Sequence, residues 1–178
     1  TLDGRIAAQN GDSKWITGEL ARKRVHQLRA QSDAIVVGAG TVRADNPLLT
    51  VRDAQGPSPR RIVLGSADPS ANVHPCTEWN GTLTDLLDTL GREGVLQLFV
   101  EGGARVAASF HNERLINQYI FHLAPTLAGG DKLPGVFHGA GAPTMDDMWR
   151  GNLVSTTVFG NDIEIILEPL PSAQKETA

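Results

Sequence analysis

The stretch Ala34-Ile35-Val36-Val37-Gly38-Ala39-Gly40-Thr41 decides the fold class of this chain. Its unbroken apolar run predicts a short strand that is buried on both faces, as in a parallel sheet covered by helices. The glycines that follow end the strand and let the backbone turn at once into another element. We expect Thr41 to cap a brief helix there. A strand of this kind indicates an α/β protein.

Residues on either side of this strand show helical or extended periodicity. Leu20, Ala21, Val25 and Leu28 fall on one side of a helix that we expect from about Gly18 to Ser32. Weaker strand candidates are Leu48–Val51 and Arg61–Leu64, on either side of a loop that contains Pro57 and Pro59. We expect residues from about Ala67 to Gly81 to form loop.

A second strand, glycine and helix unit follows. Apolar spacing predicts a helix within Gly81–Glu93, another buried strand over Val95–Val100 that occupies a central place in the sheet, and a helix over Ala104–His111 after Glu101-Gly102-Gly103. The C-terminal part predicts a strand over Asn117–Leu123, a glycine-rich loop over Thr126–Gly141, and a hairpin of Val154–Phe159 with Ile163–Leu167. We therefore expect one mixed α/β domain over residues 1–171, with a mainly parallel sheet flanked by helices and an antiparallel C-terminal hairpin. Residues 172–178 are expected to be a frayed polar tail.

Composition narrows the class of protein further. The chain has 178 residues, 40% of them hydrophobic, and a formal net charge of -4, which disfavours wrapping nucleic acid or coating an anionic membrane. No apolar run approaches the roughly 20 residues that span a bilayer, and the N-terminal residues lack the pattern of a secretion signal. Because Cys76 is the one cysteine, neither an internal disulfide nor a cysteine-based metal site can form. We expect a cytoplasmic protein without a metal.

The two strand–glycine–helix units are candidate phosphate sites. Helix N-termini offer free N–H groups, and two such half-sites suit a dinucleotide at the carboxyl ends of a sheet, although neither matches GxGxxG. Arg29 could bind a phosphate with its planar fork. Asp3, Asp45 and Glu101 lie beside glycine or proline at element ends, and the last two are the better candidates for proton transfer. Trp15 could cover a flat ring or fill core.

Short motifs along nearly the whole chain resemble the reductase domain of bacterial riboflavin biosynthesis, the C-terminal half of the bifunctional deaminase-reductase. They are Thr1-Leu2-Asp3-Gly4-Arg5-Ile6-Ala7, Gly11 to Thr17 ending in Trp-Ile-Thr, Ala21-Arg22, Val25-His26, Leu28-Arg29-Ala30, Asp33-Ala34-Ile35, Gly40-Thr41-Val42, Asp45-Asn46-Pro47, Leu49-Thr50-Val51-Arg52 and Glu101-Gly102-Gly103. The resemblance implies a dihydrofolate-reductase-like fold. It also implies NADPH-dependent reduction of 5-amino-6-(5-phosphoribosylamino)uracil at the ribosyl C1' to the ribitylamino product, and it implies a homodimer.

The resemblance also implies roles for individual residues. Those that match substrate-holding positions are Ser13, Arg29, Leu49, Arg52 and Glu101. Those that match NADPH-facing positions are Trp15, Thr41, Asp45, Ser66 and the segment Gly103–Ser109, which includes Ala104, Arg105, Val106 and Ala107. Asp45 and Glu101 are the two candidates for the proton donor.

Some features depart from the family pattern. His74-Pro75-Cys76 lacks the second cysteine of a deaminase zinc site, so we expect no deaminase domain in this chain. The chain begins where the first strand of the family would end, so a preceding segment is expected to be absent, and the stretch from Ser66 to Gly81 is shorter than usual. Alternatives are a related reductase for the diaminopyrimidinone phosphate or for a pterin or folate, and a noncatalytic nucleotide-binding domain. A homodimer would pair the C-terminal hairpin, whose apolar residues are Val154, Val158, Ile163, Ile165 and Ile166.

Overall fold

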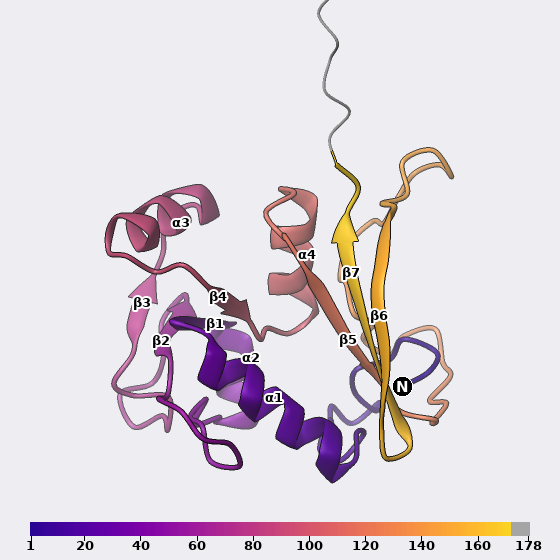
Figure 1. The fold of residues 1–178 in the computed structure, drawn as a ribbon, viewed down its shortest axis with the longest axis horizontal. Helices are drawn as coiled ribbons and strands as arrows, with labels where there is room; N and C mark the ends of the chain where they lie inside the picture. Colours follow the sequence, from indigo (N-terminus) through magenta and orange to yellow (C-terminus); the bar gives the residue numbers. More distant parts are fainter. Residues whose placement is uncertain (172–178) are drawn as a thin grey trace, which may run out of the picture.

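A four-stranded parallel sheet forms one half of the protein (Figure 1). The structure is a computed structural model that describes residues 1–171, so the expected tail at 172–178 lies outside the described residues. The strand order is β3 (Thr77–Trp79), β2 (Arg60–Leu64), β1 (Ala34–Gly38) and β4 (Leu98–Val100). Every residue of β1 is buried, as expected for a strand with a neighbour on each side and cover on both faces.

Four helices pack around this sheet: α1 (Glu19–Gln31), α2 (Ala39–Asp45), α3 (Leu83–Arg92) and α4 (Ala104–Asn112). The predicted ends of α1, α3 and α4 are confirmed to within two residues, and the brief helix expected near Thr41 is present as α2. The start of α3 shows why the local sequence suffices. Thr82 accepts a hydrogen bond from the Asp85 N–H at 3.1 Å and donates its hydroxyl to the Asp85 carboxylate at 2.7 Å, which satisfies a helix-end N–H.

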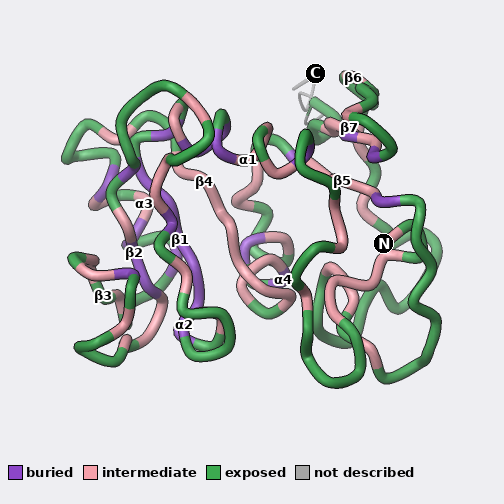
Figure 2. The backbone as a smooth tube through the Cα atoms, turned by 90° about the horizontal axis from the view of Figure 1, so that it is seen from below, coloured by how far each residue is buried: buried purple, intermediate pink, exposed green. Residues whose placement is uncertain are grey.

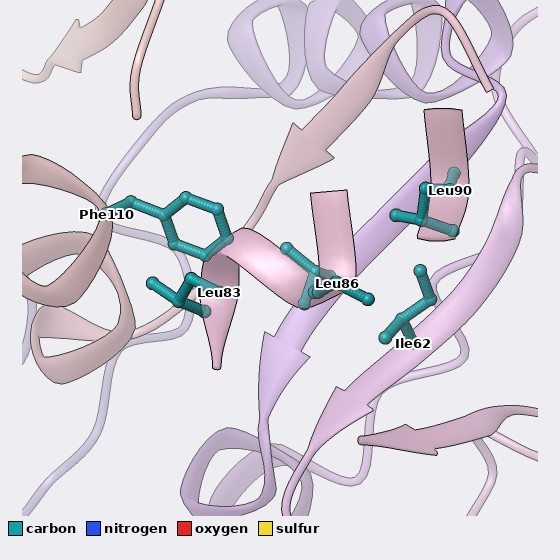
Figure 3. Close-up of a cluster of buried hydrophobic side chains, with 7 residues drawn as sticks. Ile62, Leu83, Leu86, Leu90 and Phe110 are labelled. Atoms are coloured by element: carbon teal, nitrogen blue, oxygen red, sulfur yellow. The ribbon is translucent and has the colours of Figure 1, made fainter. Parts of the chain in front are cut away.

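Alternate residues of β1 supply two separate hydrophobic cores. Ala34 and Val36 pack with Leu86 of α3 and Phe110 of α4 in the first core, which Figure 3 shows in close-up. Ile35 and Val37 belong to the second core, on the opposite side of the strand, where Leu49 packs. Figure 2 shows an unbroken buried stretch along β1. The two cores fix the carboxyl ends of the parallel strands rigidly in space.

The antiparallel strands form a second sheet in the order β5 (Tyr119–Leu123), β7 (Asp162–Pro169) and β6 (Gly151–Phe159). The hairpin between β6 and β7 turns at Gly160, whose φ of 68° favours glycine. Contacts from α1 tie this sheet to the rest, because Arg24 Nε donates to Glu164 Oε2 at 3.0 Å and the Gly18 N–H donates to Asp162 Oδ2 at 2.6 Å. The mixed α/β class with an antiparallel C-terminal hairpin is confirmed, with the strands divided between two sheets.

Between the two sheets lies an apolar cavity of about 670 Å³. Its walls include Leu98 and Val100 of β4 and Ile120 of β5. Both strands are edge strands of their own sheets, and in the part of the chain that the structure describes they do not pair with each other. The expectation of a central, buried strand over Val95–Val100 is therefore wrong: β4 is a short, half-buried edge strand.

Three further local expectations are wrong. Leu48–Val51 is not a strand, because Leu49 has a φ of 54° and side chains satisfy the main chain there. The stretch Ala67–Gly81 is not all loop, since β3 pairs with β2 within it. Thr41 does not cap α2, because the helix already begins at Ala39 after Gly38. In the first two cases a tertiary contact overrides the local pattern.

Candidate active site

Three of the candidate site residues lie at the carboxyl edge of three adjacent parallel strands. Register pairs Gly38 with Leu64 and Val36 with Val100, so the segments that follow β2, β1 and β4 leave the sheet at the same edge. Ser66, Thr41 and Glu101 lie in those segments. Ligands of open α/β sheets bind at this edge, where loops rather than strands carry the side chains.

Arg29 and Glu101 form the strongest polar contact at this edge. Arg29 Nε donates to Glu101 Oε2 at 2.7 Å, and Nη2 donates to Oε1 at 2.5 Å. Arg29 Nη1 donates to the Thr50 carbonyl at 3.1 Å. The Arg29 side chain is buried and that of Glu101 is partly open, so the pair presents a carboxylate rather than an arginine to an incoming ligand. The expected phosphate fork of Arg29 is already directed at Glu101.

A glycine-dependent contact brings α4 onto the ends of the strands. A Cβ on Gly102 would lie 2.7 Å from Val106 Cβ, and one on Gly38 would lie 2.8 Å from Val106 Cγ2. Both glycines are therefore needed for packing, because Val106 occupies the space that their side chains would take. Val106 faces the sheet at this contact, so its side chain fixes the orientation of α4.

The first turn of α4 remains open to a ligand. Its N-cap, Gly103, has no side-chain cap, and a Cβ on Gly103 would lie 3.2 Å from Thr41 Oγ1. Apart from its chain neighbours and the backbone of α2, no atom lies within 4 Å of a Cβ built on Gly40. The two glycine units thus meet in space, with Thr41 between them. Free N–H groups beside an open glycine surface form a cradle that fits a nucleotide phosphate.

The remaining predicted residues lie at different depths. Trp15 is 74% exposed on the loop before α1, where the Arg22 guanidinium lies 4.3 Å from the centre of its ring. Leu49 is 2% exposed and packs in the second core, so the residue itself is not open to a ligand. Asp45 is exposed at the end of α2. Ser66 is exposed, Ser13 is half-buried, Ala104 and Ala107 are half-buried, and Arg105 is exposed.

Asp3 is removed from the proton-transfer candidates by its contacts. Its carboxylate accepts the Ala128 and Gly129 N–H groups at 3.1 and 2.7 Å and the Thr1 hydroxyl at 2.5 Å. The hydrogen bond from Thr1 and then that from Gly129 lower the pKa of Asp3 from 3.8 to about 2. Asp3 therefore holds the glycine-rich loop to the start of the chain.

Sequence reasoning missed how the loop Leu49–Arg52 is held. The Arg52 N–H donates to His26 Nδ1 at 3.2 Å, and His26 Nε2 lies 3.4 Å from Asp53 Oδ2. The three-residue spacing of His26 and Arg29 indicates that both side chains lie on one face of α1. The partners could not have been found that way, since they are main-chain atoms of a loop.

A membrane-spanning helix and a metal-binding cluster are both absent from residues 1–171. Within this range no helix combines the length and apolar character needed to cross a membrane. The same residues contain no group of three or more histidine, cysteine, aspartate or glutamate side chains that could hold a metal ion.

Comparison with known proteins places the chain in a family. The family described as "RibD C-terminal domain" matches residues 1–165. The riboflavin biosynthesis protein RibD of Bacillus amyloliquefaciens is 33% identical over 95% of this chain and 55% of its own length. The RibD protein of Corynebacterium ammoniagenes is 39% identical over 72% of this chain and 42% of its length. The chain thus spans about half the length of the curated relatives that it matches.

Solved structures give the same result. RibD of Acinetobacter baumannii superposes with a TM-score of 0.86 at 28% identity, covering 96% of this chain and 55% of that one. A deaminase and 5-amino-6-(5-phosphoribosylamino)uracil reductase of Thermotoga maritima superposes with a TM-score of 0.78 at 25% identity, covering 95% of this chain and 54% of that one. The matched part of each structure corresponds to both sheets of the fold described above.

Proposed function

Since the chain belongs to the RibD C-terminal domain family, we propose that it is an NADPH-dependent reductase of riboflavin biosynthesis. Its substrate is 5-amino-6-(5-phosphoribosylamino)uracil, and its product is the corresponding ribitylamino compound. One observation carries this proposal: the Arg29–Glu101 pair and the open glycine cradle of Gly103 lie at the same edge of one sheet. A polar sugar–pyrimidine substrate and a dinucleotide need adjacent sites of these two kinds.

The cradle fits the pyrophosphate of a nicotinamide dinucleotide. The N–H groups of Gly103, Ala104 and Arg105 would hold it at the uncapped start of α4, with Thr41 beside them. Ser66 and Trp15 would contact other parts of the cofactor. When bound there, NADPH supplies the hydride that reduces C1' of the ribosyl group.

We propose that Glu101 and Arg52 form the substrate side, while the buried Leu49 anchors the loop that carries Arg52. The Glu101 carboxylate, oriented by two bonds from Arg29, would accept hydrogen bonds from substrate N–H or O–H groups. The exposed Arg52 would bind the sugar phosphate, since the Arg29 fork is occupied. Ser13 is the remaining substrate contact that we propose.

Reduction also needs a proton for the atom that gains charge when C1' accepts hydride. We propose Asp45 as the source of this proton, because both carboxyl oxygens of Glu101 already accept hydrogen bonds from Arg29. Asp45→Asn is then expected to lower kcat by roughly a hundredfold or more with little change in KM. Glu101→Gln is expected to raise KM more than it lowers kcat. The reverse pattern would make Glu101 the proton donor.

Parallel assays of NADPH oxidation test the proposal directly. The chain is offered the deaminated phosphoribosylaminouracil, the undeaminated diaminopyrimidinone counterpart and dihydrofolate in separate reactions. Turnover of the first alone is the expected result. Turnover of the second or the third would assign a related reductase instead, and NADPH binding without any oxidation would indicate a noncatalytic nucleotide-binding domain.

The cellular setting follows from the same proposal. We expect the protein to work in the cytoplasm as a homodimer and to receive its substrate from a deaminase activity. The single cysteine and the exposed apolar residues of β6, Val154 and Val158, support these expectations.

A further inference from the structure

The loop that carries Arg52 has no strand to hold it. Two side chains of α1 hold it by its main chain instead: Arg29 Nη1 donates to the Thr50 carbonyl at 3.1 Å, and His26 Nδ1 accepts the Arg52 N–H at 3.2 Å. Residues three apart on a helix share a face, so α1 presents one donor and one acceptor to the loop. Arg29 is also hydrogen-bonded to Glu101. Of these two side chains, His26 is the one that contacts the main chain of Arg52.

The contact determines which ring nitrogen of His26 carries the proton. Because Nδ1 accepts a hydrogen bond through its lone pair, Nδ1 carries no proton and the neutral ring has its proton on Nε2. That nitrogen lies 3.4 Å from Asp53 Oδ2. The buried ring is hydrogen-bonded to the main chain of Arg52 on one side and faces the carboxylate of Asp53 on the other. By fixing the main chain of Arg52, the His26 ring restrains the direction in which the Arg52 side chain projects from the loop.

We propose that His26 is a positioning residue for substrate binding, whose unprotonated Nδ1 fixes the main chain of Arg52 and so aims its guanidinium at the anionic group of the substrate. This inference rests on the proposed function, because it requires Arg52 to bind the substrate phosphate. It assigns His26 no contact with the reacting atoms. It deepens the site by adding a residue that acts only through Arg52.

Protonation of the ring reverses the contact. A protonated imidazole carries N–H on both nitrogens and cannot accept from the Arg52 N–H. Arg29, Arg52, Asp53 and Glu101 are the charged groups that act on the ring, and burial, followed by Arg29, lowers the His26 pKa below 6.5. The contact is therefore intact at neutral pH. It is lost as the pH falls through that lowered pKa, and KM for the phosphorylated substrate is expected to rise in the same range.

Three variants separate this role from a merely structural one. His26→Asn keeps an acceptor close to the position of Nδ1 but does not titrate, and His26→Phe removes the acceptor. Gln27→Ala changes the exposed neighbour on α1 and serves as the matched control. For each, KM and kcat are measured with the phosphorylated substrate over a range of pH, together with NADPH affinity and the unfolding temperature.

We expect His26→Phe to raise KM about three- to tenfold at neutral pH, the effect of losing one hydrogen bond, while kcat changes less than about twofold. His26→Asn is expected to keep the neutral KM and to show a smaller rise of KM at acid pH than the wild type, because the part that remains comes from protonation of the substrate phosphate at about pH 6. Gln27→Ala is expected to behave as wild type. A wild-type KM for His26→Phe, or an acid rise of KM as large in His26→Asn as in the wild type, would overturn the proposal. If His26→Phe does not fold, the comparison of the wild-type and His26→Asn pH profiles decides.

Amide hydrogen exchange at Arg52 tests the contact without any substrate. The Arg52 N–H is expected to be protected in the wild type and in His26→Asn and to exchange faster in His26→Phe, while neighbouring residues of α1 keep their protection. Equal exchange in all three would overturn the inference. Protection as expected together with no turnover by the wild type would show that the proposed function had failed while the His26–Arg52 contact stands.

Discussion

Arg29 and Glu101, 72 positions apart in the sequence, form a two-point ion pair in which Nε and Nη2 of the arginine each donate to a different carboxylate oxygen. The pair joins α1 to the segment after β4, and through the Thr50 carbonyl it also holds the loop Leu49–Arg52. Three segments of the candidate site thus meet at one guanidinium. A planar fork suits this task, because a lysine ammonium cannot make both carboxylate contacts in the same plane.

Arg29→Lys is expected to lower kcat/KM by roughly ten- to a hundredfold, because a charge-assisted hydrogen bond contributes about 1.5–3 kcal/mol. The measurement is steady-state kinetics with NADPH and the phosphorylated substrate. Arg105→Lys is an informative comparison, since Arg105 is exposed and is proposed to contact only the cofactor. An unchanged kcat/KM in Arg29→Lys would show that the ion pair does not orient Glu101.

Gly102→Ala is expected to destabilise the protein by about 1–3 kcal/mol, because its new Cβ would meet Val106 Cβ at 2.7 Å. Chemical unfolding measures the effect. Val106→Ala in the same chain is expected to restore part of the loss, since it removes the opposing methyl groups. Gly91→Ala is the matched control: nothing lies within 4 Å of its Cβ in α3, so stability should rise by about 0.5–1 kcal/mol.

Asp3→Asn is expected to lower stability at neutral pH and to remove an acid-dependent step. The pKa of Asp3 is about 2 in the folded protein and 3.8 without its hydrogen-bond partners. The contribution of Asp3 to folding stability is therefore complete above pH 3.8 and is lost as the pH falls toward 2. Unfolding temperatures of both proteins across this range test the sign. Curves that stay parallel from neutral pH to pH 2 would contradict the assignment.

Val158→Lys is expected to convert the proposed homodimer into a monomer. Val158 is 67% exposed on β6, the outer strand of the antiparallel sheet, and a charge there opposes both edge pairing and burial of that face. Light scattering at several concentrations gives the mass of each protein. A wild-type protein that is monomeric at high concentration would remove the homodimer proposal.

The edges of β4 and β5 that are unpaired within residues 1–171 are expected to accept an extra strand fused before Thr1. The Leu2 N–H donates to the Thr126 carbonyl at 2.9 Å, which places the start of the described chain just beyond the end of β5. An extended apolar segment of about five residues, fused before Thr1, is expected to pair with both edges and fill the cavity, as a strand completes a sheet. The unfolding temperature should rise. A glycine-serine segment of equal length is the control, and equal temperatures for the two fusions would contradict the prediction.

The sequence determined the elements whose signal is local. The apolar run Ala34–Val37, the helical spacing within Gly81–Glu93 and the Gly160 turn each gave the right element, because a buried strand, an amphipathic helix and a tight turn depend on residues that are near one another in the chain. The paired glycine units and their place after parallel strands were also correct. The residues of the site were found by type and motif, and their roles remain proposals.

Only the tertiary structure decided how those elements and side chains meet. It put the strands into two sheets, moved the strand at Val95–Val100 from a central to an edge position, and turned Leu48–Val51 from a strand into a loop held by His26 and Arg29. It also directed the Arg29 fork at Glu101. The physical reason is that strand pairing and ion pairs join residues many positions apart, and a main-chain N–H or carbonyl offers the same group at every position, so the sequence carries no local mark of its partner.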